Sequence, residues 1–373
     1  MKIDKISSQL LGFAFYVDKQ KPGTVSENWL DEQILRQVKD FEVDDIKKFE
    51  DEFHTNLSKV EDENRKIFLE QLFDSLTFQL SSDDSDLDTF YKKTFFIEIE
   101  EVTDDFVKSL EDEIKQLSYH LGKEYPEIQK GCLVKKNEMI TLFEGYLGEA
   151  KKKLPAWIKM PENNLEYELV SDVSWSAFNQ HTKPFSSKIL INSDLPVTTY
   201  DLKNLVQHES WAGHHTELCL KDRLLVEEGR GEHGIVITYS PQTYLSEALA
   251  VAMFDIWGFE DWLSEDEQLL FLVDKLIFAL QNKTTFLLHK HQKSEDEVRN
   301  VLAKSLLTDT QREYILGFSL DNTYGKYAAV YHSSGEYLRS SYQIAQNKDG
   351  LLQSLFTQPM TVERVEKMVL AST

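Results

Sequence analysis

Three histidines and a glutamate stand within eight residues of this chain. The segment runs His208-Glu-Ser-Trp-Ala-Gly-His-His215, although the whole sequence of 373 residues has only 10 histidines. Imidazole nitrogen is a preferred ligand of Zn²⁺. A glutamate directly after the first histidine, here Glu209, is where zinc peptidases keep the general base that deprotonates a metal-activated water. The segment therefore predicts a metal-dependent hydrolase.

The spacing of the histidines differs from the helical motif H-E-x-x-H, in which the two ligands lie one turn apart. His214 and His215 follow His208 by six and seven residues. On a regular helix His215 would return to the face of His208 about 10 Å further along the axis and would have to lean back, whereas His214 would lie roughly 120° away. His214 could join His208 only if the helix is over-wound, bulged or broken, and Gly213 tolerates such a backbone. The spacing leaves both histidines open as the second ligand.

Glu247 is the candidate third ligand. It is the only charged residue in the apolar segment Tyr244-Leu-Ser-Glu-Ala-Leu-Ala-Val-Ala-Met-Phe254. A carboxylate that faces a core is costly unless it is paired or bound to a metal. Pro241 suits the first turn of a helix here, and Gly258 suits its end. The alternative interpretation gives Glu247 a solvent-facing position or an ion pair with an arginine.

Residues 185–340 resemble a bacterial family of unknown function that has the signature H-E-x-x-P-G-H-H and is related to the gluzincin-like helical zinc peptidases. The spacing of the signature is kept, with Ala212 in place of the proline. Residues 191–196 and 246–250 are similar to the family's segment before the motif and to its later glutamate-bearing helix. Residues 331–339 are similar to its tyrosine, glycine and arginine segment, with altered spacing. The resemblance implies a zinc peptidase in which Glu247 is the downstream ligand.

The resemblance also suggests roles for residues around the metal. It places a tyrosine near the site, so Tyr331 is expected to donate a hydrogen bond to the tetrahedral intermediate, with Tyr239 and Tyr244 as alternatives. Arg339 is a candidate for binding a substrate carboxylate, which suits an exopeptidase. His181, between two expected strands, is a candidate for lining the cleft. The expected partner is a peptide or small amide substrate. The alternative interpretation of these tyrosine, arginine and histidine side chains is ordinary packing or an ion pair.

Two other functions would use the same residues. A catalytically silent binding protein would retain the helical fold and lack the metal, and the alanine at position 212 is compatible with this. A non-heme iron enzyme would use the same two-histidine, one-carboxylate set for Fe(II) chemistry, but such sites usually lie in β-barrels. Zinc content of protein purified without added metal separates the first alternative from the hydrolase, and oxygen uptake with ferrous iron tests the second.

Composition narrows the class of partner. The net charge of −23 argues against nucleic acid and anionic membranes, because phosphate groups are bound by clustered Lys and Arg. No run reaches the about 18 apolar residues of a membrane span. The apolar run at residues 10–17 is short and lacks a small-residue cleavage site, so a signal peptide is not predicted. Cys132 and Cys219 are too few for a disulfide framework, which predicts a cytoplasmic protein.

The pattern along the chain predicts a mainly α-helical, metallopeptidase-like architecture. Residues 167–178 and 185–191 alternate and carry β-branched or aromatic side chains, which predicts a β-hairpin just before the metal-binding helix. By analogy with helical zinc peptidases, the edge of this sheet would align the substrate backbone. We expect an N-terminal helical region at 1–160 and a metal-binding catalytic region at 161–373, packed as one compact unit. Helical periodicity is found at 26–79, 104–121, 136–158, 202–220, 241–257, 265–293, 311–318, 324–346 and 362–370.

Overall fold

The computed structural model describes residues 3–81, 85–173, 175–182 and 185–370. It is 65% helical and 8% strand, which confirms the prediction of a mainly α-helical fold with a small sheet. Among the described helices, none combines the length and the apolar composition that a membrane crossing requires.

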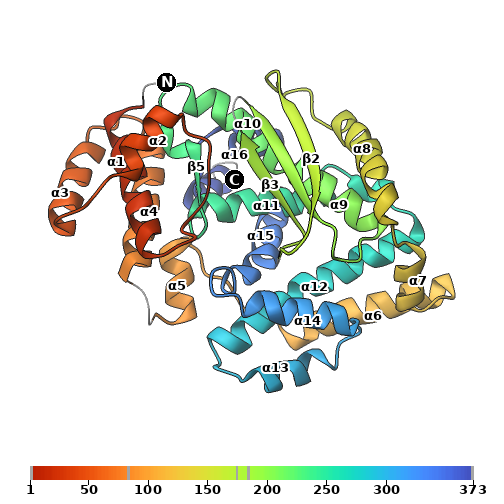
Figure 1. Ribbon diagram of the computed structural model, residues 1–373. Coiled ribbons are helices and arrows are strands. Elements are labelled where there is room, and N and C mark those ends of the chain that lie inside the picture. The colour runs from red at the N-terminus through yellow and green to blue at the C-terminus, as the bar shows by residue number, and fades with distance from the viewer. Residues whose placement is uncertain (1–2, 82–84, 174, 183–184, 371–373) are drawn as a thin grey trace.

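The N-terminal region packs around a hydrophobic core of its own. Residues 10–17, the apolar run near the N-terminus, lie on its first helix and face this core, in which the rings of Phe13 and Phe73 are 5.0 Å apart. The elements of this region, drawn in red and orange in Figure 1, are α1 (Lys5–Gln20), β1 (Val25–Asn28), α2 (Glu32–Lys39), α3 (Ile46–Leu57) and α4 (Glu63–Ser81).

The helical prediction that begins at residue 26 is wrong over β1. This strand pairs antiparallel with β5 (Ile235–Ile237), so that Val25 lies opposite Ile237. Ile235 and Ile237 are fully buried in the N-terminal core. The partner strand is far along the chain, and its pairing therefore left no local pattern around residue 26.

A buried ion pair joins α4 to the 3₁₀ turn Gly231–Gly234 that precedes β5. Arg65 Nε lies 2.7 Å from Glu232 Oε1, and the hydroxyl of Ser7 donates a hydrogen bond to the other oxygen at 2.6 Å. The Glu232 side chain is fully buried and depends on Arg65 for compensation, whereas Arg65, 11% exposed, also pairs with Asp4 at 2.6 Å. This network holds β5, and through it β1, against the N-terminal helices.

The middle of the chain has no separate core. Its helices are α5 (Leu87–Thr94), α6 (Asp104–Leu121), α7 (Tyr125–Gly131) and α8 (Lys136–Lys152). Their buried side chains, such as Phe90 and Phe143, belong to one hydrophobic cluster with the C-terminal helices. The chain therefore passes from the N-terminal core to the larger core between α4 and α5. The boundary expected at residue 160 lies within the part of the chain that forms the larger core.

The larger sheet is three-stranded and mixed, with the order β2-β4-β3. Its strands are β2 (Asn164–Val170), β3 (Ala177–Thr182) and β4 (Ser186–Asn192). The predicted hairpin exists as β3 and β4, but the stretch 167–178 is not one strand. Its first part belongs to β2, which runs parallel to β4 on the opposite edge, so β3 is left as an edge strand.

The C-terminal half supplies the remaining helices. Helices are confirmed at four of the predicted positions, 241–257, 265–293, 311–318 and 362–370. The single helix expected at 202–220 is divided into two helices. In Figure 1 α9 lies beside the lower end of the larger sheet, and α12 and α14 run below the sheet. The helices are α9 (Thr199–Glu209), α10 (His214–Lys221), α11 (Pro241–Ile256), α12 (Glu265–His289), α13 (Glu295–Leu302), α14 (Asp309–Ser319), α15 (Val330–Ile344), α16 (Lys348–Thr357) and α17 (Val362–Leu370).

The Arg65–Glu232 pair provides a test of how the N-terminal region is attached. Replacing Glu232 by Ala leaves the Arg65 guanidinium buried without its main partner, so we expect the free energy of unfolding to fall by about 3 kcal/mol. Urea denaturation measures this. Glu63→Ala is the control, because that side chain is 70% exposed and 3.7 Å from Lys66; a change below about 0.5 kcal/mol is expected. Equal effects of the two substitutions would contradict the role given to Glu232.

Candidate metal centre

The helix that carries His208 breaks directly after Glu209. Helix α9 begins with a capping box between Thr198 and Asp201 and ends where Ser210 leaves helical backbone, at φ −116° and ψ −112°. Gly213 then passes so close to α9 that a Cβ on it would lie 1.8 Å from the carbonyl oxygen of His208. Helix α10 begins at the next residue. The helix is therefore broken near Gly213, which is the condition under which His214 could join His208.

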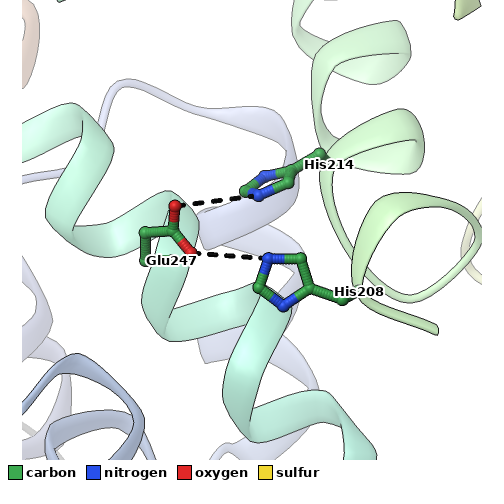
Figure 2. Close-up of side chains that lie close together, drawn as sticks. All are labelled: His208, His214 and Glu247. Atoms are coloured by element: carbon green, nitrogen blue, oxygen red, sulfur yellow. Dashed lines mark ion pairs between the residues drawn. The ribbon is translucent and has the colours of Figure 1, made fainter. Parts of the chain in front are cut away.

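This break brings His208, His214 and Glu247 together. Both imidazoles face the Glu247 carboxylate in Figure 2: His208 Nε2 lies 3.5 Å from Oε2, and His214 Nε2 lies 4.0 Å from Oε1. One ligand atom from each residue lies within 4.8 Å of the other two. Glu247 belongs to α11, which is fixed against α9 by a 2.8 Å hydrogen bond from Gln207 Nε2 to the carbonyl of Ala250.

The donor set fits a zinc ion. Ligand atoms at about 2.0–2.1 Å from a tetrahedral Zn²⁺ are separated from each other by about 3.4 Å. The separation of His208 Nε2 and Glu247 Oε2, 3.5 Å, meets this value, and the three ligand atoms lie within 4.8 Å of one another. Glu247 Oε2 is buried and has no hydrogen-bond partner among the described residues. Burial lowers the pKa of His208, and the neutral imidazole is the form that binds a metal. Two imidazoles and one carboxylate leave a fourth position open, as catalytic zinc sites do.

A hydrogen-bonded chain orients the ring of His214. Its Nδ1 lies 3.1 Å from the hydroxyl of Ser246, which donates to Glu217, and Glu217 in turn pairs with Lys221 at 2.6 Å. Because the Ser246 hydroxyl proton points to Glu217, its oxygen accepts from Nδ1–H, and the lone pair of Nε2 faces Glu247. Burial opposes protonation of His214, but the Glu247 and other nearby carboxylates raise its pKa. Such outer contacts fix the tautomer and orientation of a metal-binding histidine.

Glu247 is held by a tyrosine. The hydroxyl of Tyr327 donates to Glu247 Oε1 at 3.0 Å, and both side chains are buried. Burial raises the pKa of Glu247, while His214 and the hydrogen bond from Tyr327 act in the opposite direction. The contact uses one carboxylate oxygen and leaves Oε2 directed to His208.

Glu209 lies beside the three candidate ligands. Its Oε1 is 4.0 Å from His208 Nε2, the side chain is 7% exposed, and Oε2 has no hydrogen-bond partner among the described residues. Burial raises the pKa of Glu209 to about 7, against the opposing effect of His214. Asn179 on β3 donates from its side chain to the Glu209 carbonyl, which ties the end of α9 to the sheet. The arrangement suits a carboxylate that exchanges a proton.

Tyr331 faces the same place from α15. Its ring stacks on Phe278 at 5.6 Å and contacts Tyr327 edge to face. Burial raises the pKa of Tyr331, and the Glu247 and Glu209 charges add to the effect, so the hydroxyl stays protonated close to both carboxylates. Together with His208, Tyr331 lines a small cavity of about 40 Å³. The position suits a neutral hydrogen-bond donor.

Two histidines considered from the sequence lie outside the cluster of His208, His214 and Glu247, and one of them, His181, lines an open groove together with Glu27 and Trp29. His215 is fully buried, with Nδ1 2.9 Å from the hydroxyl of Ser187, so it points into the sheet and not toward Glu247. The side chain of His181 reaches the same serine at 3.4 Å and lies 3.6 Å from Asp222. Of the two open candidates for the second ligand, the structure therefore brings His214 to the cluster.

Tyr239 and Arg339 are engaged in other contacts. The hydroxyl of Tyr239 donates to the carbonyl of Thr323 at 2.6 Å, which places it in the packing between helices. Arg339 lines the small cavity beside His208, but its guanidinium is bonded to Asp255 and, at 2.8 Å, to Glu336. Neither residue is presented to a substrate in the way the sequence suggested.

Four side chains at the site were missed by the sequence analysis. Ser246 precedes Glu247, and Tyr327 lies one turn before Tyr331, so helical spacing could have identified both. Glu217 follows His214 by three residues, so the same helical spacing could have identified it. Glu27 of β1 had no local signal, yet it accepts a hydrogen bond from the backbone of His181 on β3.

Comparisons with known proteins show the fold alone. A scan against known protein families gives no match, and no curated protein is similar in sequence. A crystal structure described as "the putative lipoprotein from Colwellia psychrerythraea" is similar over 95% of this chain and 68% of its own, at 13% identity and a TM-score of 0.58. A "putative lipoprotein of unknown function" from Shewanella oneidensis covers 91% of this chain and 70% of its own, at 13% identity and a TM-score of 0.53.

The close approach of Gly213 to α9 predicts a specific defect. In Gly213→Ala the new methyl group meets the His208 carbonyl, so the break must rearrange; we expect the free energy of unfolding to fall by about 2 kcal/mol or more and zinc uptake to be lost. Urea denaturation and metal analysis measure the two effects. Gly145→Ala on α8 is the control, because nothing lies within 4 Å of its Cβ; it should stabilise by about 0.5–1 kcal/mol. Similar behaviour of both variants would show that the break tolerates a side chain.

Proposed function

We propose that this protein is a zinc-dependent hydrolase of peptide or small amide bonds. The observation that carries the proposal is the convergence of His208, His214 and Glu247 beside the buried carboxylate of Glu209. The resemblance of residues 185–340 to a family related to helical zinc peptidases supports the same assignment. The mainly α-helical fold is compatible with it and argues against an iron oxygenase, whose site usually lies in a β-barrel.

The chemistry divides between the metal and the side chains around it. When bound, the zinc ion would act as a Lewis acid toward water and the scissile carbonyl. Glu209 would accept a proton from the attacking water and deliver it to the nitrogen of the leaving amine. Tyr331, protonated and directed to the same space, would donate a hydrogen bond to the carbonyl oxygen as negative charge develops there.

The proposal includes a cytoplasmic location. It rests on Cys132 and Cys219, both of which are free thiols. Because the similar solved structures are described as putative lipoproteins, the informative test is fractionation of cells that express the full-length gene product. Recovery with the membrane fraction would contradict a cytoplasmic location without affecting the chemistry.

Metal content tests the ligand assignment. Glu247→Ala removes the only carboxylate of the donor set, so we expect the zinc content of purified protein to fall from about one ion per chain to near zero. Glu113→Ala on the exposed face of α6 is the matched control and should retain the metal. Equal zinc in Glu247→Ala and in the unmodified protein would remove Glu247 from the ligands. Absence of stoichiometric zinc in the unmodified protein would favour a silent binding protein.

Hydrolysis tests the role of Glu209. Glu209→Gln keeps the size of the side chain and removes the proton acceptor, so we expect zinc content to be unchanged and kcat to fall by about 10²–10⁴-fold. A peptide library incubated with and without a chelator identifies a cleaved substrate for this measurement. Full turnover by Glu209→Gln on such a substrate would show that another group accepts the proton.

A further inference from the structure

We propose that Glu27 binds the N-terminal ammonium group of a peptide, so that the protein acts as an aminopeptidase. The inference rests on the proposed function and specifies its substrate class. Glu27 lies on β1 in the N-terminal region, for which the sequence predicted no part in the site. Three observations carry it: the position of Glu27 at the edge of the larger sheet, the groove around it, and the balance of charge at the centre.

Glu27 occupies one end of the exposed edge of β3. Its Oε2 accepts a hydrogen bond of 3.0 Å from the backbone N–H of His181. That N–H therefore points away from β4, and by the alternation of an antiparallel pair the main-chain groups of Asn179 face the same edge. A peptide that added to this edge as a further strand would have to end where the Glu27 carboxylate stands. The terminal group of the peptide would lie against the Glu27 carboxylate. A carboxylate forms an ion pair with an ammonium group, so this end of the peptide would be its N-terminus.

The surroundings of Glu27 form an open groove along β1 and β3. The groove has a volume of about 430 Å³ and is lined by Glu27, Trp29, Phe178 and Gln180, among others. The indole of Trp29 packs edge to face on His181 and gives the groove an aromatic wall. Strand β3 links Glu27 to the centre: the backbone N–H of His181 donates to Glu27, and Asn179, two residues earlier, donates from its side chain to the Glu209 carbonyl. The terminal amine and the scissile bond of one substrate can therefore be near Glu27 and Glu209 together.

The charges at the centre favour a cationic substrate end. Glu27, Glu209 and Glu247 contribute three carboxyl groups around the centre, more negative charge than one divalent ion balances when all three are ionised. An ammonium group on the substrate would neutralise this excess, whereas a substrate carboxylate would add to it. Arg339, the candidate for binding a C-terminus, is already bonded to Asp255 and Glu336. The buried Glu209 Oε2 and Glu247 Oε2, which lack hydrogen-bond partners among the described residues, point to the same need for positive charge.

Hydrolysis of matched peptides tests the substrate class with zinc-loaded protein. We expect acetylation of the N-terminus to lower kcat/KM by about 10–100-fold, the loss typical of a hydrogen bond to a charged group, and amidation of the C-terminus to have little effect. N-methylation adds bulk but keeps the positive charge, and should be tolerated better than acetylation. Equal cleavage of free and acetylated peptides would overturn the aminopeptidase assignment and leave the hydrolase standing.

Binding tests the role of Glu27 without turnover. Leucine hydroxamate and its N-acetyl derivative are titrated calorimetrically into the zinc-loaded protein. We expect the free amine to bind about tenfold or more tightly than the acetylated compound, and this difference to vanish in Glu27→Gln with zinc content unchanged. Glu32→Gln, an exposed position on α2, is the control and should keep the difference.

Each remaining outcome of the binding experiment decides against the proposal. Equal affinity of the two hydroxamates in the unmodified protein, or binding of neither, would overturn it even if a peptidase activity is found. Loss of zinc in Glu27→Gln would identify Glu27 as a metal ligand in place of an amine-binding residue. Failure of the proposed function is recognised separately, as absence of zinc from the unmodified protein.

Discussion

The candidate metal centre depends on one steric fact, the contact between the backbone of Gly213 and the carbonyl of His208. A regular helix would place His214 on a different face from His208. The closure at Gly213 ends α9 and starts α10 within a few residues, and the two imidazoles meet as a result. The same closure directs the side chain of His215 toward the sheet, where its Nδ1 lies within hydrogen-bond distance of the Ser187 hydroxyl. One backbone position therefore decides which histidine joins the site and which is structural.

Around this closure the protein places several carboxylates where few cations balance them. Burial disfavours the charged form of Glu209, Glu247 and Glu27, and it raises the pKa of each. Unpaired buried charge is expensive, so such an arrangement persists where a bound cation compensates it. A zinc ion and a substrate ammonium are two cations that the same geometry would accommodate.

The N-terminal region contributes to the site although its core is separate. Arg65 on α4 and Ser7 on α1 hold Glu232, which directly precedes β5, and β5 pairs with β1. Strand β1 then presents Glu27 to the edge of β3. The similarity to the two solved structures extends over 95% and 91% of the chain.

The sequence alone determined the helical class, most helix positions and the residues able to hold a metal, because periodicity, glycine and the clustering of histidines are local properties. It also pointed to Gly213 as the place of the break. Only the tertiary structure decided between His214 and His215, split the expected strand into β2 and β3, and engaged Arg339 with Asp255. It also brought Tyr327 to Glu247 and Glu27 to the sheet edge. These contacts join segments far apart in the chain, and no spacing along the sequence encodes the distance between them.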